Sequence, residues 1–179
     1  MNYHNITHED MNNGDGLRVV LWCSGCSLHC KGCQNPQTWD ATSGILFDNQ
    51  AKEEIFEQLS KPYIAGLTFS GGHPLEDYNA EEVYKLAKEI KEKFPQKTIW
   101  LYTGFLWEYI FPTITLDEFN IYNTYRQEIV RLCDVVVDGP YIEEQRDITL
   151  KWRGSKNQRV IDVKKTIEAG NKNVILLCD

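Results

Sequence analysis

Apolar runs of strand length alternate along the chain with segments whose apolar residues recur at helical spacing. This alternation predicts an α/β fold with parallel strands. The first run, Leu17–Cys23, is almost continuously apolar, as in a strand that is buried on both faces. Residues 79–94 form the clearest predicted helix, because apolar residues recur every three or four positions from Val83 to Ile90 and Pro95 follows.

The other predicted elements continue the alternation. Strands are predicted at residues 66–69, Thr98–Tyr102, 135–137, 159–163 and 174–177, and helices at Asn49–Ser60, 125–132 and in a short segment that ends at Gly170. Five or six β/α units are too few for a closed eight-stranded barrel. We therefore expect one domain, residues 1–179, that forms an incomplete parallel β/α barrel. The aromatic stretch 106–123 lacks regular periodicity and is interpreted as an insertion at the open side or on the outer surface.

Three cysteines follow the first strand in the pattern C-x3-C-x2-C: Cys26, Cys30 and Cys33. Thiolates so close together on one loop suit a soft metal or an iron–sulfur cluster. Three ligands would leave one iron of a four-iron cluster open for chemistry, as an open position does on catalytic zinc. The alternative is a zinc site that adds His29 or Cys23, in a non-catalytic interaction module. Zinc sites usually combine two separated ligand pairs, and no second Cys/His pair follows, so the cluster is favoured.

Composition and charge narrow the class of protein. Cys23, Cys133 and Cys178 each lie in an apolar run and are expected in the core, which is not the pattern of a disulfide framework. The inferred compartment is a reducing cytoplasm. The net charge is −7 without a dense Lys/Arg cluster, which disfavours a nucleic-acid partner. The longest apolar runs are strand-sized and the N-terminus is polar, so neither a membrane span nor a signal peptide is expected.

Polar or glycine-rich motifs follow several predicted strands: Gly71, Gly72 and His73, then Thr103, then Asp138. The carboxyl ends of parallel strands meet at one edge, where α/β proteins bind ligands. The glycine pair would let a ligand approach the backbone, although such a pair alone is usually a turn. A charge on Asp138 would be costly if it were buried without a partner. We therefore expect Asp138 at an exposed pocket edge, with a plain turn residue as the alternative.

A donor-rich segment near the C-terminus reads Trp-Arg-Gly-Ser at residues 152–155 and Asn-Gln-Arg at residues 157–159. Its arginines offer planar sets of donors that suit a carboxylate. The alternative is a solvated loop with an arginine stacked on Trp152. Together with the cysteine loop and residues 13–18, 71–74 and 102–104, this segment resembles the activating proteins of anaerobic ribonucleoside-triphosphate reductases, within the radical S-adenosylmethionine (SAM) superfamily. The resemblance covers residues 1–162.

The resemblance implies a partial barrel of the radical SAM type and an oxidoreductase that cleaves SAM reductively. One [4Fe-4S] cluster would be bound by Cys26, Cys30 and Cys33, with SAM on its fourth iron. SAM contacts are expected from Gly71, Gly72, His73, Thr103, Asp138 and Arg153. Family members often have an acidic residue where this chain has His73, so only backbone contacts are expected there.

The implied partner is the large subunit of the reductase, which would receive a glycyl radical. A one-electron donor such as flavodoxin or ferredoxin is expected to reduce the cluster. An activase of another glycyl radical enzyme, such as pyruvate formate-lyase, is the alternative within the class. Those activases are usually longer and lack the Trp-Arg-Gly-Ser and Asn-Gln-Arg segment.

Overall fold

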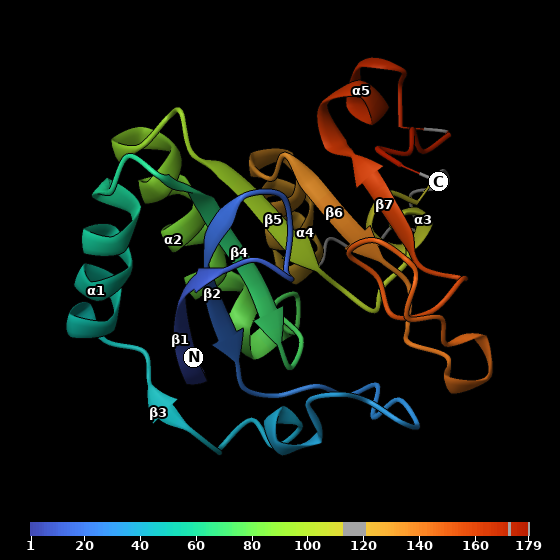
Figure 1. Ribbon diagram of the computed structural model, residues 1–179, viewed down its shortest axis with the longest axis horizontal. Helices are drawn as coiled ribbons and strands as arrows, with labels where there is room; N and C mark the ends of the chain where they lie inside the picture. Colours follow the sequence, from blue (N-terminus) through green and yellow to red (C-terminus); the bar gives the residue numbers. More distant parts are fainter. Residues whose placement is uncertain (113–120, 172, 179) are drawn as a thin grey trace.

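The fold is described by a computed structural model that covers residues 1–112, 121–171 and 173–178. Its strands form one mixed sheet in the order β3-β1-β2-β4-β5-β6-β7 (Figure 1). They are β1 (Asn2–Asp10), β2 (Leu17–Cys23), β3 (Ile45–Leu46), β4 (Ile64–Gly71), β5 (Thr98–Tyr102), β6 (Val135–Asp138) and β7 (Arg159–Asp162). The helices are α1 (Asn49–Ser60), α2 (Asp77–Lys93), α3 (Trp107–Ile110), α4 (Ile121–Leu132) and α5 (Val163–Glu168), with short 3-10 helices at Pro36–Thr38 and Glu143–Gln145.

The centre of the sheet confirms the predicted α/β class. Strands β2, β4, β5 and β6 are parallel neighbours, and β3 and β7 form the two edges of an open sheet. The outer strands differ from the prediction. β7 is antiparallel to β6, and residues 174–177 add only a single bridge between Leu176 and Ile161 instead of a strand. β1 was not predicted because it lacks an apolar pattern, and it is held by antiparallel pairing with β2 and β3.

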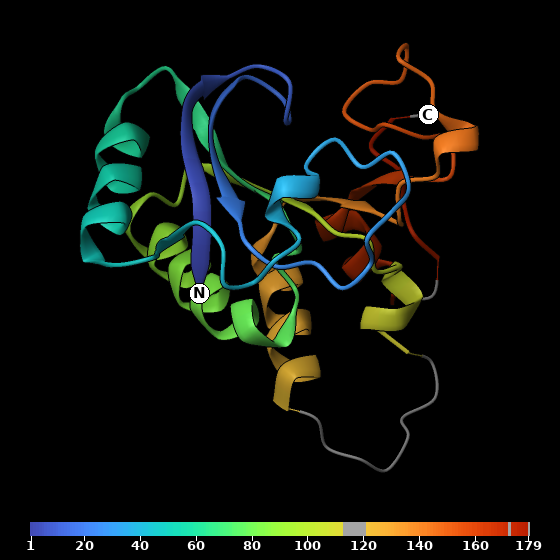
Figure 2. The ribbon, with the colours of Figure 1, turned by 90° about the horizontal axis from the view of Figure 1, so that it is seen from below.

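The two faces of the sheet have different coverings, because successive side chains of a strand point to opposite sides. On one face, alternate residues such as Val19 and Leu21 pack against α1, α2 and α4 in the main core. Figures 1 and 2 show these helices gathered on that side of the strands. On the other face, Trp100, Val137 and Val160 belong to a smaller cluster. The helices α1, α2 and α4 do not cover this second face, which is free to line a cavity.

Arg18 is fully buried on this second face, near the start of β2. Its Nε donates to the Thr68 hydroxyl at 2.7 Å, and its Nη2 donates to the carbonyls of Leu67 and Thr98. The guanidinium lies 5.4 Å from the centre of the Trp100 ring. Burial lowers the pKa of Arg18 to about 10, so the side chain stays charged at neutral pH. Arg18 thus ties β2 to β4 and β5 beneath the cavity.

The stretch interpreted as an insertion, 106–123, is only partly described, since residues 113–120 lie outside the described residues. Its first part forms α3, whose Trp107 and Ile110 are buried in the main core. The described first part is therefore core structure, and the interpretation as a surface insertion is wrong for it. Trp107 packs into the core where α3 contacts α4, whereas Tyr109 stays exposed.

Candidate functional site

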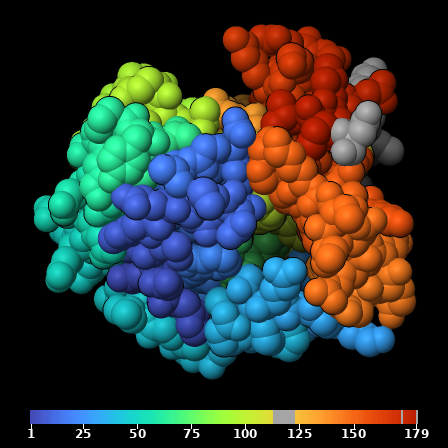
Figure 3. Space-filling model, in the orientation of Figure 1, coloured from blue at the N-terminus to red at the C-terminus, as the bar shows by residue number. Residues whose placement is uncertain are grey.

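A cavity of about 610 Å³ opens at the carboxyl ends of the parallel strands. Its walls are the cysteine loop, the segment 70–73 after β4, the segment 102–104 after β5 and residues 139–158. Figure 3 shows the hollow between the light-blue cysteine loop, the dark-blue N-terminal strands and the orange segment 139–158. The sequence-based expectation that these motifs meet at one edge is confirmed for all of them except Asp138.

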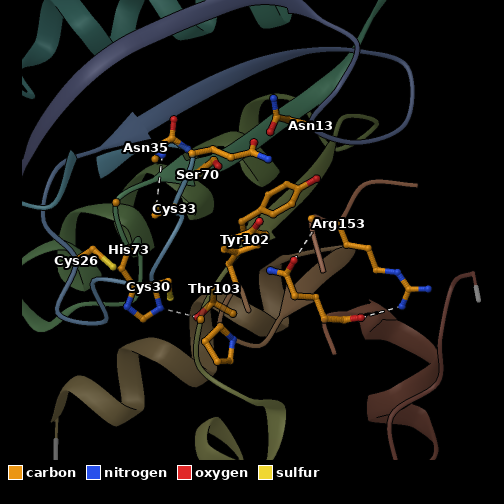
Figure 4. A pocket seen from close by; sticks show the side chains of 18 of the residues that line it. Asn13, Cys26, Cys30, Cys33, Asn35, Ser70, His73, Tyr102, Thr103 and Arg153 are labelled. Carbon is orange, nitrogen blue, oxygen red and sulfur yellow. Dashed lines mark hydrogen bonds between the residues drawn. The ribbon is translucent and has the colours of Figure 1, made fainter. Parts of the chain in front are cut away.

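Cys26, Cys30 and Cys33 all line this cavity and are half-buried free thiols. The loop turns back on itself, since the Cys33 amide donates to the Cys30 carbonyl at 3.0 Å. Gly32 allows this turn because its φ is +73°, a conformation that favours glycine. The Cys33 sulfur also accepts the Asn35 amide at 3.4 Å, which is drawn in Figure 4. Such N–H···S contacts help to keep a thiolate in place.

Three free thiols on one loop are a donor set that suits an iron–sulfur cluster. Within the described residues, no three His, Cys, Asp or Glu side chains are gathered around a single ion position. The two residues that a zinc site would add have other contacts. His29 stacks on Trp39 with ring centres 4.8 Å apart, and Cys23 is buried in the main core. Burial raises the pKa of Cys23 to about 12, which disfavours a thiolate there.

The other two cysteines outside the loop also pack against apolar residues. Cys133 is buried in the main core, and Cys178 is half-buried against the smaller cluster. The predicted core positions of Cys23 and Cys133 are therefore confirmed. Burial raises the pKa of Cys26 above that of a free thiol, so metal binding at this residue must displace a proton.

Gly71 and Gly72 allow the turn after β4 to pack closely against residues 23–25. The Gly72 amide donates to the Cys23 carbonyl at 2.8 Å, and the His73 amide donates to the Gly25 carbonyl at 2.7 Å. A Cβ on Gly72 would lie 2.4 Å from the Gly25 oxygen, and a Cβ on Gly71 would lie 2.7 Å from the Cys23 nitrogen. The space that a side chain at either glycine would need is therefore taken by the protein's own backbone, and the expected contact of a ligand with the glycine backbone stays a prediction. The glycines let the turn after β4 pack on the cysteine loop.

His73 is almost completely buried at the cavity wall, and both of its ring nitrogens have protein partners. Nε2 lies 2.7 Å from the Thr103 hydroxyl, and Nδ1 lies 3.3 Å from the Glu76 carboxylate (Figure 4 shows the Thr103 contact). The same Glu76 oxygen accepts the amide and the hydroxyl of Ser27. Burial opposes ionisation of Glu76, but the hydrogen bonds from His73 and Ser27 outweigh it and lower its pKa to about 2.

Sequence analysis did not single out Glu76. It precedes α2, where a polar residue would ordinarily be taken for a helix cap, yet its side chain makes no capping hydrogen bond. No local pattern indicates that this carboxylate turns toward the cysteine loop some fifty residues earlier. Only the packing of α2 beside the loop brings the two together.

Asp138 does not line the cavity, and the expected exposed position at its edge is wrong. Its side chain is fully buried. Oδ1 accepts Nε of Arg159 at 2.9 Å, and Oδ2 accepts the Trp107 amide at 2.8 Å. The buried charge is therefore paired, and this pairing removes the cost on which the expectation rested. Arg159 also forms two hydrogen bonds with Glu108, near the start of α3.

The polar side chains of the donor-rich segment mainly form hydrogen bonds with backbone groups of the chain itself. The Gln158 side chain accepts the Gly154 amide at 2.9 Å and donates to the Gly139 carbonyl at 3.1 Å. Asn157 donates to the Pro140 carbonyl at 2.7 Å. These bonds fix the turn after β6 beside residues 152–159. The cation over the Trp152 ring is Lys151, at 3.9 Å, and not an arginine as one interpretation had it.

Arg153 is the member of this segment that keeps donors free among the described residues. Its Nη1 donates to the Gln158 carbonyl at 2.8 Å, while its buried Nε has no partner in the described part of the chain. Figure 4 shows Arg153 on the side of the cavity opposite the three cysteines, with its guanidinium pointing away from them. The guanidinium of Arg153 is therefore not directed toward a group held at the three cysteines.

Comparison with known proteins identifies the family. The model of the 4Fe-4S single cluster domain matches residues 12–161. The anaerobic ribonucleoside-triphosphate reductase-activating protein of Enterobacteria phage T4 is 41% identical over 160 residues, which cover 89% of this chain and 93% of that protein. Proteins with the same name from Haemophilus influenzae and Escherichia coli K12 are 38% and 37% identical, over 88% and 89% of this chain and 96% and 97% of their own lengths. The chain belongs to this family of activating proteins.

For this member of the activating proteins, the structure adds cavity residues that sequence motifs did not indicate. Trp22, Ser70 and Tyr141 line the cavity beside the predicted residues, together with Asn13 of the motif at residues 13–18. Trp22, Ser70 and Tyr141 belong to no sequence motif. For Trp22 and Ser70, the alternation of side chains along a strand is the signal that could have placed them on the uncovered face. Among the described helices, none has the length and apolar character required to cross a membrane.

Proposed function

We propose that this chain is an iron–sulfur radical SAM activase for the large subunit of an anaerobic ribonucleoside-triphosphate reductase. In this proposal Cys26, Cys30 and Cys33 bind one [4Fe-4S] cluster and SAM occupies the cavity beside it. The open sheet with one uncovered face acts as a partial barrel of the radical SAM type. The observation that carries the proposal is the meeting of three free thiols of one loop with the turns after β4 and β5 in one cavity.

Cys26, Cys30 and Cys33 would hold the cluster, which would supply the one electron needed to cleave SAM reductively and so to generate a glycyl radical on the partner. The chain's own residues orient SAM and keep water away. The backbone of Gly71, Gly72 and His73 offers polar groups to the ligand at the turn after β4. Thr103 lies beside His73 in the wall, and the aromatic residues Trp22 and Tyr102 provide apolar lining.

The substrate is another protein, so the cavity must be reached from outside. The opening between the cysteine loop and residues 139–158 provides such access (Figure 3). We propose that the glycine-bearing segment of the large subunit enters there and meets Arg153 on the far wall. A one-electron donor such as flavodoxin or ferredoxin would reduce the cluster near the exposed part of its loop.

The deciding experiment mixes this chain, after anaerobic reconstitution with iron and sulfide, with the purified large subunit, SAM and a reductant. The expected result is a glycyl radical signal in the electron paramagnetic resonance (EPR) spectrum of the large subunit. Cys30→Ala is the matched control and is expected to give no signal. A folded, cluster-loaded protein that yields neither 5′-deoxyadenosine nor a glycyl radical would refute the proposal.

The same preparation also distinguishes the proposed function from two alternatives. A zinc-binding interaction module would purify with zinc and without acid-labile sulfide, whereas the match to a 4Fe-4S domain supports iron. An activase of another enzyme would give a radical on pyruvate formate-lyase and none on the reductase subunit. The proteins matched across nearly their full length carry the reductase activator name, which supports the reductase.

A further inference from the structure

Glu76 is a buried carboxylate placed between two walls of the cavity. Its side chain is 10% exposed and makes no ion pair with a lysine or arginine within the described residues. A carboxylate in such a place requires hydrogen-bond donors, because leaving it unpaired would be costly. The donors come from two segments that are far apart in the sequence: Ser27 in the cysteine loop and His73 in the turn after β4.

The contact with the cysteine loop involves one atom of Glu76. Its Oε1 accepts the Ser27 amide at 2.9 Å and the Ser27 hydroxyl at 2.5 Å. Hydrogen bonds to an ionised acceptor are shorter and about twice as strong as neutral ones. Ser27 directly follows Cys26, the first cysteine of the loop. The position of the Glu76 carboxylate therefore fixes the backbone where the loop begins.

The second contact extends from Glu76 to the cavity wall. In the neutral tautomer that carries its hydrogen on Nδ1, His73 donates to Glu76 through Nδ1 and accepts the Thr103 hydroxyl through Nε2. The Thr103 oxygen is in turn the acceptor for the Phe105 amide at 3.1 Å. Each group in this series has a partner that fixes its direction. The series joins the cysteine loop, the turn after β4 and the turn after β5.

We propose that Glu76 is a positioning residue that holds the start of the cysteine loop against the turn after β4 and orients the Thr103 hydroxyl through His73. Glu76 touches neither cluster nor substrate in this proposal. Its consequence for the cluster rests on the proposed function, but the fixing of the loop does not. Asn79 supports the same junction, since its Nδ2 donates to the carbonyls of Ser24 and His73.

The first test uses the metal-free protein, so that it does not depend on the proposed function. Glu76→Gln keeps the shape and an acceptor oxygen but removes the charge. We expect the Ser27 amide to exchange its hydrogen on the order of ten times faster, as measured by NMR, because a charge-assisted bond becomes a neutral one. Amides in the middle of α2 should be unaffected. Glu81→Gln is the matched control on the same helix, since Glu81 is exposed and pairs only with Lys85.

Ser27→Ala and the double variant Ser27→Ala/Glu76→Gln complete the set. If the two residues act as a unit, the loss of protection in the double variant should be smaller than the product of the two single losses. Unchanged exchange at Ser27 in Glu76→Gln would overturn the proposal. An equal rise in exchange throughout the chain would also overturn it, because it would show a general loss of stability.

The second test uses the reconstituted protein and records the EPR spectrum of the reduced cluster with and without SAM. We expect Glu76→Gln to bind iron and sulfide but to give an altered or broadened signal, while Glu81→Gln matches the parent. A parent-like spectrum in Glu76→Gln would overturn the effect on the cluster. If the parent protein itself binds no cluster, the proposed function fails, whereas the exchange result for the loop still stands on its own.

Discussion

Asp138 and Arg159 face each other in the antiparallel register of β6 and β7, and their side chains form a two-pronged ion pair. Asp138 is fully buried, whereas the Arg159 side chain is 26% exposed. The hydrogen bonds that Arg159 donates to Asp138 and, to a lesser extent, to Glu108 raise the pKa of Arg159 above its ordinary value. The pair therefore fixes β7 to the parallel sheet, although β7 runs in the opposite direction.

We predict that Arg159→Ala destabilises the fold by about 3 kcal/mol, because it leaves the Asp138 carboxylate buried without its cation. Urea unfolding of the metal-free protein measures this change. Glu108→Gln removes only the more exposed partner and should cost less than about 1 kcal/mol. Equal effects of the two substitutions would contradict the central role of the buried carboxylate.

The cysteines separate into two groups with different expected phenotypes. Alanine at Cys26, Cys30 or Cys33 should abolish cluster assembly, since each removes one of three thiols that line the cavity. Alanine at Cys23 or Cys133 should retain iron and sulfide and lower stability by about 1 kcal/mol, because these side chains fill the core. Iron and acid-labile sulfide analysis distinguishes the groups. A cluster lost from Cys23→Ala in a folded protein would show that the ligand assignment is wrong.

Gly72→Ala should disturb the fold around the cysteine loop, because the new Cβ would lie 2.4 Å from the Gly25 carbonyl oxygen. We expect a loss of about 2 kcal/mol in the free energy of unfolding from this overpacking. Gly170→Ala is the control: Gly170 has a φ of +88° and no neighbour within 4 Å of the added Cβ, so only the backbone strain of about 1 kcal/mol applies. A stable Gly72→Ala protein with weak SAM binding would instead favour the ligand-contact interpretation.

Arg153→Ala should leave the cluster intact and reduce the yield of glycyl radical. The guanidinium lies on the wall opposite the cysteines (Figure 4), so we expect SAM cleavage without the partner to persist. Radical yield on the large subunit and uncoupled formation of 5′-deoxyadenosine are the two measurements. Lysine should rescue little, because it offers a point charge instead of a planar set of donors. A matching fall in uncoupled cleavage would assign Arg153 to SAM.

The stability of the metal-free protein should decrease in acid partly through Glu76. Its pKa in the folded protein is lowered to about 2 from an ordinary value of 4.5. Because the pKa of Glu76 is lower in the folded protein than in the unfolded chain, ionised Glu76 stabilises the fold. This contribution is complete above about pH 5 and is lost as pH falls from 4.5 toward 2. Urea unfolding at pH 6 and pH 3 should show a smaller loss in Glu76→Gln than in the parent. An identical loss would exclude this role of Glu76.

The class of fold and the chemistry of the cysteine loop could be predicted from the sequence. Near-continuous apolar runs such as Leu17–Cys23 indicated central parallel strands, and the spacing of Cys26, Cys30 and Cys33 indicated three thiols on one loop. Both signals are local: they depend on residues within about ten positions of one another. The order of strands and motifs was enough to place glycines, Thr103 and cysteines at one edge.

Which polar side chains face the cavity, and which are bonded to other segments, could not be predicted in this way. Asp138 seemed too costly to bury, but Arg159 reaches it across an antiparallel pairing that no local pattern indicates. Glu76 belongs to no motif in the sequence, yet it accepts hydrogen bonds from Ser27, some fifty positions earlier. Strand β1 carries no apolar pattern and exists through backbone pairing with its neighbours. Partners of this kind depend on distance in space, which the spacing along the chain does not determine.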